Sequence, residues 1–358
     1  HVLSRQEFYT AYTPYQPEIS QGTLQAIFEY QTMMCELTGL DVSNASMYDG
    51  ATAMAEAASM ALNITGRDEI IVSNTVNPQY RKVLETYSRF NESKVIEFGR
   101  KDGKANLEEL NSLISEKTAG VIIQNPNFFG IIEDVKEACN IAHKKGSLFI
   151  AGVNPISLGL LKSPGSMGAD IVVGDGQPLG NPLSFGGPSF GFLTAKLEYL
   201  RKMPGRIVGE TVDKNGKRAF VLTVQTREQH IRRERATSNI CSNQALNALA
   251  ATVYLSALGK QGFREMANLC FQKSHYAYNK LIGTGIFQSA FSAPFFNEFL
   301  LKSTIPVKEL NNKLIKQQII GGLQIEKYYP DIENGWLIAV TEKRSKEDID
   351  NLARKAVG

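Results

Sequence analysis

The sequence is poor in cysteine and histidine, with only four of each among its 358 residues. The cysteines, Cys35, Cys139, Cys241 and Cys270, lie far apart and form no C-x-x-C pair. This spacing argues against a structural zinc site. So few cysteines in a chain of this size are typical of a protein in the reducing cytoplasm. We therefore expect no metal centre and a cytoplasmic location.

Long apolar runs and large basic clusters are also missing. No apolar run approaches the roughly 18 residues that span a bilayer, and no signal peptide is visible. The formal net charge is only +3, whereas a nucleic-acid binder needs clustered Lys and Arg. The basic stretches Arg232–Arg235 and Lys343–Arg344 are short, and acids interrupt or flank them, so we interpret them as solvated helix faces or salt bridges. Neither a membrane nor nucleic acid is expected as a partner.

What the sequence does contain is a series of short continuous apolar runs that alternate with helical patterns. They predict strands at 69–73, 94–98, 120–124, 147–151 and 171–173, and helices at 79–89, 106–114 and 135–144. Continuous apolar runs are typical of strands buried on both faces, and their alternation with helices is typical of a parallel sheet. The chain is long enough for one large α/β domain and a smaller one.

The two ends of the chain differ from this middle part. Residues 1–22 are rich in Tyr, Pro and Gln and predict an extended arm, because Pro14 and Pro17 disfavour a regular helix. A helix from an N-cap at Ser20 to Gly39 follows, and a second helix is expected at 53–62. Helices at 245–258 and 262–281 and strands at 220–224, 297–301 and 336–340 are expected later. We thus predict an arm and helix at 1–40, a large domain at 41–255, and a small C-terminal α+β domain at 256–358.

Four blocks of sequence are more specific than this pattern. They are Tyr9–Gly22, Met47–Thr52, Gln124–Asn127 with Gly130, and Ala236–Cys241. Together they resemble glycine decarboxylase, the P-protein of the glycine cleavage system, and in particular subunit 1 of its two-subunit form. Subunit 1 of that family has a further segment before the first block, and we expect it to be absent here.

The resemblance implies an α/β fold of the fold-type-I pyridoxal-phosphate (PLP) transferase kind, with a mainly parallel sheet in the large domain. It implies a glycine dehydrogenase (decarboxylating) in which subunit 2 holds PLP and this chain is the non-PLP-binding subunit. The complex decarboxylates glycine and transfers the aminomethyl group to the lipoyl arm of H-protein. The implied partners are subunit 2, in an α2β2 heterotetramer, and H-protein. This chain alone is expected to be inactive.

Three positions that handle PLP in the catalytic subunit are replaced here. The stretch from Ile171 to Phe192 places an apolar strand before a polar loop and a Gly-Gly-Pro, the layout that presents the Schiff-base lysine in fold-type-I enzymes. Gln177 occupies the lysine position, and an amide nitrogen forms no imine. Ala151 occupies the position of the acid that pairs with the pyridine nitrogen. Asn74 occupies the position of the histidine that stacks on the ring. We expect no catalytic residue in this chain.

Two other segments are compared with the family. Gly50, Ala51 and Thr52 open a helix, where backbone N–H groups bind anions, and we interpret them as a vestigial phosphate cradle or as an ordinary helix start. In fold-type-I dimers the neighbouring chain forms part of the site wall. Tyr12, Tyr15 and Gln16 are therefore interface or channel candidates, and simple packing in the dimer interface is the alternative.

Two competing functions remain open. One is an autonomous PLP enzyme that uses another lysine, such as Lys162 or Lys196. The other is a catalytically dead scaffold or regulatory paralogue. Among the remaining groups, Glu133-Asp134 is interpreted as a helix start and His143 as a helix-end cation. The polar segment 226–233, which contains His230, is expected to be solvated or to face a partner or an anionic group.

Overall fold

A seven-stranded sheet forms the centre of the protein, whose computed structural model describes residues 1–90 and 93–357. Its strands, in spatial order, are β1 (Val42–Ser43), β9 (Gly191–Ala195), β8 (Ile171–Asp175), β7 (Leu148–Val153), β6 (Thr118–Asn125), β2 (Glu69–Ser73) and β3 (Lys94–Phe98). The five strands from β8 to β3 are parallel, and β9 runs antiparallel to both β8 and β1. The predicted parallel sheet of a fold-type-I subunit is confirmed.

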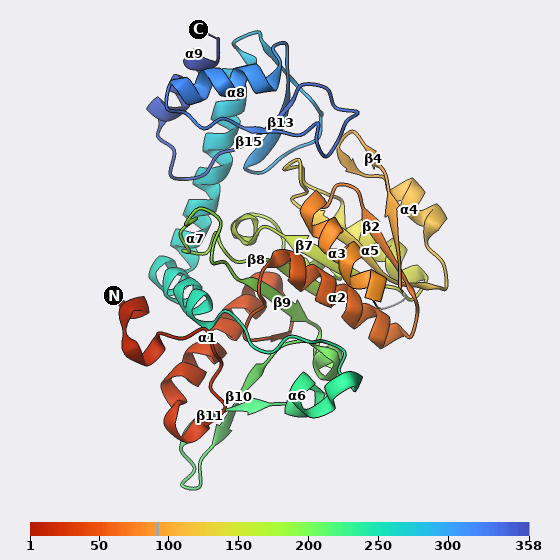
Figure 1. Ribbon diagram of the computed structural model, residues 1–358, viewed down its shortest axis with the longest axis vertical. Coiled ribbons are helices and arrows are strands. Elements are labelled where there is room, and N and C mark those ends of the chain that lie inside the picture. The colour runs from red at the N-terminus through yellow and green to blue at the C-terminus, as the bar shows by residue number, and fades with distance from the viewer. Residues whose placement is uncertain (91–92, 358) are drawn as a thin grey trace.

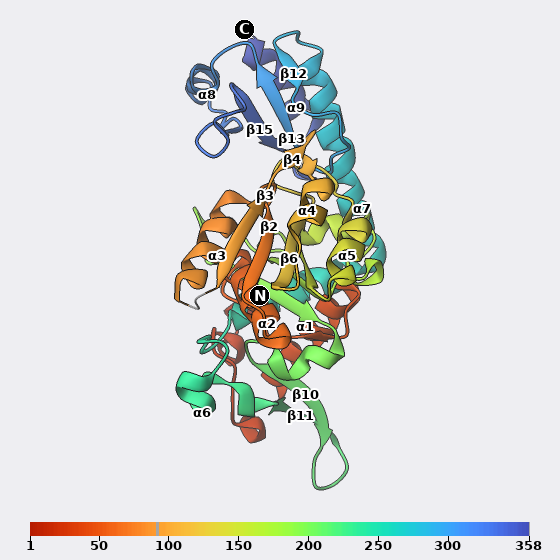
Figure 2. The same cartoon turned by 90° about the vertical axis from the view of Figure 1, so that its right-hand side faces the viewer.

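Helices cover both faces of this sheet (Figures 1 and 2). On one face α2 (Gly50–Thr65) and α3 (Pro78–Phe90) pack over a cluster that contains Met54, Leu84 and Ile150. On the other face α1 (Gln21–Thr38), α4 (Leu107–Leu113), α5 (Val135–Lys144) and α7 (Ala245–Ile282) pack over a second cluster that contains Phe149 and Ala151. Consecutive residues of β7 thus serve opposite faces, which explains its continuous apolar run.

A smaller antiparallel sheet lies at the C-terminal end of the chain. Its spatial order is β12 (Phe287–Ser289), β13 (Glu298–Ser303), β15 (Gly335–Ala339) and β14 (Leu323–Gln324). The helices α8 (Val307–Lys316) and α9 (Lys346–Val357) and the end of α7 cover it around the buried Trp336. Two hairpins complete the strands, β4 (Arg100–Lys101) with β5 (Lys104–Ala105) and β10 (Ile207–Val212) with β11 (Arg218–Thr223). The short helix α6 covers Gln229–Arg232.

The long helix α7 runs from the large sheet to the small one (Figure 1). The sequence predicts two helices here, and the structure joins them across a break at Gly259, where φ is 63° and ψ is 178°. This conformation is essentially restricted to glycine. The break lies just after the boundary that the sequence predicts between residues 255 and 256. The division of the chain into three domains remains a prediction.

Two expectations for local structure are wrong. The arm is not extended, because residues 2–4, 6–8 and 17–19 form short 3-10 turns, which are too brief to leave a periodic pattern. The predicted N-cap position of Ser20 is confirmed, although its side chain makes no capping hydrogen bond in α1. Helix α2 starts at Gly50 instead of Ala53, since Asp49 and Thr52 form a capping box. The strand β9, which the sequence analysis did not predict, extends the central sheet beyond β8.

Two features are absent from residues 1–90 and 93–357. No helix in these ranges is long and apolar enough to cross a membrane. No group of three or more His, Cys, Asp or Glu side chains there is arranged to hold a metal ion.

Candidate functional site

The three positions that we predict to be replaced lie along one edge of the central sheet. Asn74 directly follows β2, Ala151 lies in the second half of β7, and Gln177 follows β8 by two residues. These strands are parallel, so their carboxyl ends meet at the same edge. In open α/β sheets this edge is where ligands bind. The sequence therefore placed the three residues at a common site, although their surroundings differ.

Ala151 is buried in the apolar core. It is only 1% exposed and pairs with Ile123 of β6 and Val172 of β8. A carboxylate at this position would lie among apolar side chains, at a cost of several kcal/mol for an unpaired ion.

Gln177 is held by its own loop. Its side-chain Nε2 donates to the Asn181 carbonyl oxygen at 2.7 Å, and its backbone N–H donates to Asp175 Oδ1 at 2.9 Å. Ser189 Oγ donates to the same Asp175 oxygen at 2.6 Å. Asp175 therefore fixes the start and the end of the loop that follows β8.

Asn74 connects the sheet edge to the C-terminal part of the chain. Its carbonyl oxygen accepts a hydrogen bond from the Tyr329 hydroxyl at 2.6 Å. Arg81 Nη2 donates to the same hydroxyl at 3.4 Å, and the Arg81 guanidinium carbon lies 5.9 Å from the centre of the Tyr329 ring. The side-chain Oδ1 of Asn74 is buried and has no donor within residues 1–90 and 93–357.

The start of α2 is closed by the chain's own carboxylates. Asp49 Oδ1 accepts from the Thr52 N–H at 2.7 Å and from the Thr52 hydroxyl at 2.8 Å. Asp175 Oδ2 accepts from the Gly50 N–H at 3.2 Å. Three of the donors expected to bind an anion are thus already engaged by carboxylates, which are favoured at the N-terminal end of a helix. Ala51, the remaining residue of the predicted cradle, is buried inside the first turn of α2.

Tyr80 fills the remaining space beside Gly50. A Cβ on Gly50 would lie 2.4 Å from the Tyr80 hydroxyl oxygen and 2.8 Å from the Asp175 nitrogen. Burial raises the pKa of Tyr80, and the nearby Asp175, Asp49 and Glu298 carboxylates raise it further. The phenol is therefore a neutral group packed against the start of α2, and the sequence alone gave no sign of it.

The N-terminal arm is anchored at one residue and exposed at its neighbours. Thr13 is buried, and its hydroxyl donates to Asn243 Oδ1 at 2.6 Å while its carbonyl accepts from Arg206 Nη1 at 3.1 Å. Tyr12 is 53% exposed and Tyr15 is 68% exposed. Gln16 is exposed as well. The arm thus presents several aromatic rings to its surroundings from a fixed point, including those of Tyr12 and Tyr15.

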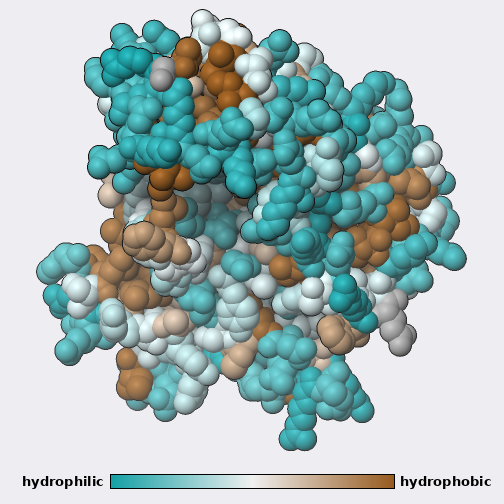
Figure 3. Space-filling model, turned by 45° about the horizontal axis from the view of Figure 1, so that its top comes forward, coloured by the Kyte–Doolittle hydropathy of each residue, from teal (hydrophilic) through white to brown (hydrophobic). Residues whose placement is uncertain are grey.

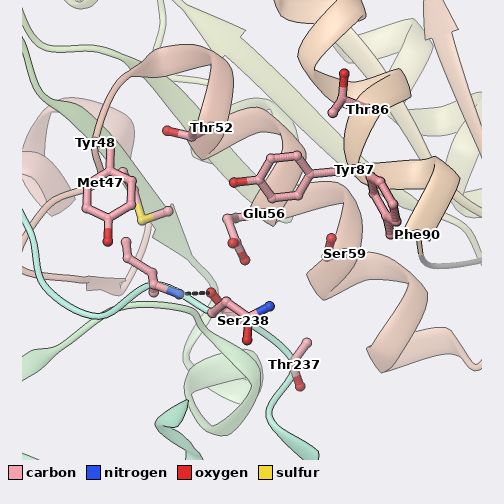
Figure 4. Close-up of a pocket in the computed structure, with 12 residues that line it drawn as sticks. Met47, Tyr48, Thr52, Glu56, Ser59, Thr86, Tyr87, Phe90, Thr237 and Ser238 are labelled. Atoms are coloured by element: carbon pink, nitrogen blue, oxygen red, sulfur yellow. Dashed lines mark hydrogen bonds between the residues drawn. The ribbon is translucent and has the colours of Figure 1, made fainter. Parts of the chain in front are cut away.

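A cavity of about 360 Å³ lies between α2, the end of α3 and residues 237–240 (Figure 4). Glu56 and Tyr87 point into it from two helices. Ser238 faces Glu56 across the cavity, and Tyr48 lies at one side. Glu56 is only 6% exposed. Burial raises the pKa of this carboxyl to about 7, and a hydrogen bond with Ser238 offsets only part of the increase. A single Glu in the Ala- and Met-rich helix was the available signal, and the sequence analysis missed it.

Glu133 is a second buried carboxyl at the sheet edge. It accepts from the Thr75 hydroxyl at 3.0 Å, Asn127 Nδ2 at 2.7 Å and the Ala105 N–H at 3.0 Å. Burial nevertheless raises its pKa to about 7. Our interpretation of Glu133-Asp134 as a plain helix start is incomplete, because Glu133 ties together three loops at the ends of the strands.

The remaining sequence candidates have structural partners. Lys196 Nζ forms an ion pair with Asp170 Oδ1, and His143 Nε2 lies 2.7 Å from Asp170 Oδ2. Burial alone would raise the pKa of Asp170, but hydrogen bonds from His143, Lys196 and the Phe149 N–H outweigh it and lower the pKa. Lys196 is thus a structural cation beside the start of β8. His230 is half-exposed, 3.4 Å from Glu228 Oε2. Lys162, in contrast, is exposed.

Fold and sheet edge together define the class of protein. Solved structures of the same fold include one titled "NIFS-LIKE PROTEIN", with a TM-score of 0.72 at 13% identity over 99% of this chain and 92% of that chain. Such neighbours are PLP-dependent enzymes of fold type I, and at this identity they show the fold alone.

The particular family follows from the sequence comparison. A family model described as "Glycine cleavage system P-protein" matches residues 1–355, and the chain belongs to this family. A protein named "Probable glycine dehydrogenase (decarboxylating) subunit 1" from Carboxydothermus hydrogenoformans is 57% identical over 98% of this chain and 79% of its own length. A crystal structure of glycine decarboxylase (P-protein) in an inhibitor-bound form matches with a TM-score of 0.95 at 45% identity, over 99% of this chain and 80% of that chain.

Proposed function

We propose that this chain is the subunit of glycine dehydrogenase (decarboxylating) that does not hold the cofactor. The complex decarboxylates glycine and passes the aminomethyl group to the lipoyl arm of H-protein in the cytoplasm. PLP is held by a related catalytic subunit, with which this chain forms an α2β2 heterotetramer. The family and the names of its relatives support the activity of the complex.

One observation carries the assignment to the non-PLP-binding role. The start of α2, where an anion would bind, is closed by Asp49 and Asp175. A PLP phosphate there would meet two carboxylates of its own sign and a buried tyrosine. The loop from Gly176 to Pro188 contains no lysine, and Gln177 donates to its own loop. These residues do not fit a PLP group, so we assign this chain no step that uses one.

The positions Ala151 and Asn74 support the same proposal. Ala151 offers no carboxylate to a pyridine nitrogen, and the backbone of Asn74 is tied to Tyr329. We propose that Gln177, Ala151 and Asn74 are replaced cofactor positions, and that Gly50, Ala51 and Thr52 form a vestigial cradle.

The contribution of this chain is then to the interface. Tyr12, Tyr15 and Gln16 lie on the outside of an arm that is fixed at Thr13, beside the N-terminal end of α7. The face of the molecule that Figure 3 shows is mostly hydrophilic. A strip of apolar side chains crosses it on the side where α7 lies in Figure 1. We propose that the arm contacts the catalytic subunit and forms part of the wall of its site.

The test is reconstitution with a catalytic subunit from the same source. The chain is mixed with that subunit and with lipoylated H-protein, and exchange of CO2 with the carboxyl group of glycine is measured. We expect exchange from the mixture and none from this chain alone. Borohydride reduction in the presence of PLP, followed by peptide mapping, should label only the partner. A pyridoxyl adduct on one specific lysine of this chain, at Lys162 for example, would overturn the proposal in favour of an autonomous enzyme. Exchange that does not require this chain would favour a scaffold.

A further inference from the structure

A second cavity, of about 190 Å³, lies on the other side of residues 237–240. This is many times the roughly 10–15 Å³ that one water needs. It is enclosed by the end of α2, by the 3-10 turns at 197–202 and 225–227, and by α6. Four cationic side chains line it, Arg201, Lys202, Arg227 and Arg232.

Arg227 is the most informative of these cations. Its Nη1 donates to the carbonyl oxygen of Met203, but Nε and Nη2 are buried and have no acceptor within residues 1–90 and 93–357. Burial lowers the pKa of the guanidinium, and the neighbouring Glu228 restores only part of it. A buried cation that is incompletely paired is costly unless an anion lies nearby.

Glu228 is the one carboxylate among the lining residues, and it is already shared. Its Oε2 lies 3.5 Å from Arg206 Nε and 3.4 Å from His230 Nδ1. Positive charge therefore exceeds negative charge around the cavity. Thr237 and Ser238 also line the cavity, and Lys202 Nζ donates to Asn63 Oδ1 at 2.7 Å.

We propose that this cavity binds a small oxyanion, either free phosphate or the phosphate of a monoester. Arginine guanidinium groups match the oxygens of phosphate in geometry as well as in charge. Several cations around an enclosed space favour a doubly charged anion over a single carboxylate. The proposal does not depend on the cofactor role of the chain, since none of the lining residues belongs to the edge that carries Asn74, Ala151 and Gln177.

Binding here has a consequence for the cavity that contains Glu56. Thr237, Ser238 and Ile240 form a wall of both cavities. Ser238 Oγ accepts from the Ile240 N–H at 3.1 Å and also hydrogen bonds with Glu56. An anion on one side of this segment therefore orders the wall on the other side.

The direct test is calorimetric titration of the chain with inorganic phosphate, with potassium chloride added to hold the ionic strength constant. We expect saturable binding of one phosphate per chain, competition by sulfate and little effect of acetate. Glycerol 3-phosphate forms a second arm, and tighter binding than that of phosphate would identify a monoester as the ligand. If acetate binds as tightly as phosphate does, or if no saturable binding of phosphate occurs, the proposal is wrong.

Three variants locate the site. Arg227→Met removes the buried charge at similar volume and should weaken phosphate binding by roughly tenfold or more, since hydrogen bonds to charged groups are strong. Arg232→Gln, on the exposed rim, should weaken it by a smaller factor and remains informative if Arg227→Met fails to fold. Arg235→Gln is the matched control, because that side chain is exposed and does not line the cavity. Equal weakening by Arg235→Gln would mean nonspecific attraction and would exclude a built site. A variant that loses phosphate binding but still supports glycine–CO2 exchange with the catalytic subunit would show that the two proposals are independent.

Discussion

The Asp175 carboxylate at the end of β8 accepts a hydrogen bond from the Gly50 N–H at the start of α2, at 3.2 Å. These residues are far apart in sequence, and their contact closes the helix end at which an anion would bind. The other Asp175 oxygen accepts from Gln177 N–H and Ser189 Oγ. One carboxylate thus holds both the helix start and the loop that carries Gln177.

This contact should prevent a lysine at residue 177, the proposed lysine position, from restoring PLP binding. In Gln177→Lys the new amine would lie beside a helix start that is already closed by Asp49 and Asp175 and packed against Tyr80. We expect no absorbance band of an imine on addition of PLP and no borohydride-stable adduct at residue 177. Absorption spectra and peptide mapping of the reduced protein provide the measurement.

Ala151→Asp tests the second replaced position that we propose, and its expected effect is on stability. Since Ala151 is 1% exposed among apolar side chains, the new carboxyl should lower the free energy of unfolding by roughly 2–5 kcal/mol. A stable imine in the Gln177→Lys single variant would show that the closed helix start is not the barrier.

A second prediction concerns pH. The pKa of Glu56 is raised by burial from 4.5 to about 7 in the folded chain. Between about pH 4.5 and 7 the folded chain therefore binds more protons than the unfolded chain, and its stability falls as the pH rises. Glu56→Gln should remove this component and be more stable than the parent at pH 8 by about 1–3 kcal/mol, with a smaller difference at pH 5.

Urea denaturation of both proteins at pH 5 and pH 8 measures the effect. Burial also raises the pKa values of Glu133 and Glu298 to about 7, so the parent and the variant keep a common slope and only their difference reports on Glu56. Glu85→Gln, at an exposed position of the neighbouring helix α3, is the control and should leave the pH dependence unchanged. Parallel curves for Glu56→Gln and the parent would contradict a buried carboxyl with a raised pKa.

The sequence predicted the central strands well because their pattern is local. Strands such as β6 and β7 are buried on both faces, and every residue of β7 is buried, so composition alone reveals them. The two-residue strand β1 and the antiparallel β9 carry no comparable run, and their pairing is set by contacts across the sheet. Arg227 likewise appeared as one cation in a polar segment, and only the fold reveals its burial.

The candidate site shows the same limit more sharply. The positions of Asn74, Ala151 and Gln177 at strand ends followed from the strand pattern and the family resemblance. The closure of α2 by Asp175 did not, because it joins residues far apart in the chain. The capping pair Asp49 and Thr52 is local, and its spacing was visible in the sequence. We interpreted Gly50, Ala51 and Thr52 as a vestigial phosphate cradle or an ordinary helix start. In the structure the Asp49 side chain supplies a carboxylate at this helix end.

A third prediction concerns the break in α7. Replacing glycine by alanine inside a helix usually stabilises a protein, but Gly259 has φ 63° and ψ 178°, which alanine adopts only under strain. Gly259→Ala should therefore lower the free energy of unfolding by roughly 1–3 kcal/mol, although no atom lies within 4 Å of the added Cβ.

Gly262→Ala is the matched control for this break. It lies one turn further along α7, and its Cβ would meet Leu258 at an ordinary 3.5 Å. This variant should gain roughly 0.5–1 kcal/mol through helix propensity. Thermal and urea denaturation of the two variants should thus give changes of opposite sign. A stabilised Gly259→Ala would mean that α7 is continuous in solution.

The last prediction concerns the arm. Tyr12 and Tyr15 are 53% and 68% exposed, and large exposed aromatic rings on an anchored backbone are typical of residues that dominate protein interfaces. Tyr15→Ala should weaken association with the catalytic subunit by about tenfold, and Tyr12→Ala should do so at least as strongly, because the Tyr12 ring also lies 5.9 Å from the Arg206 guanidinium. Neither change should alter the thermal midpoint of the isolated chain by more than a few degrees, since both rings are largely exposed.

Ile320→Ala is the control, because Ile320 is an apolar side chain in the C-terminal part of the chain that is 94% exposed. This variant should bind the partner as the parent does. Sedimentation or calorimetry of the mixed subunits gives the affinities, and equal affinities for all three variants would place the interface away from the arm.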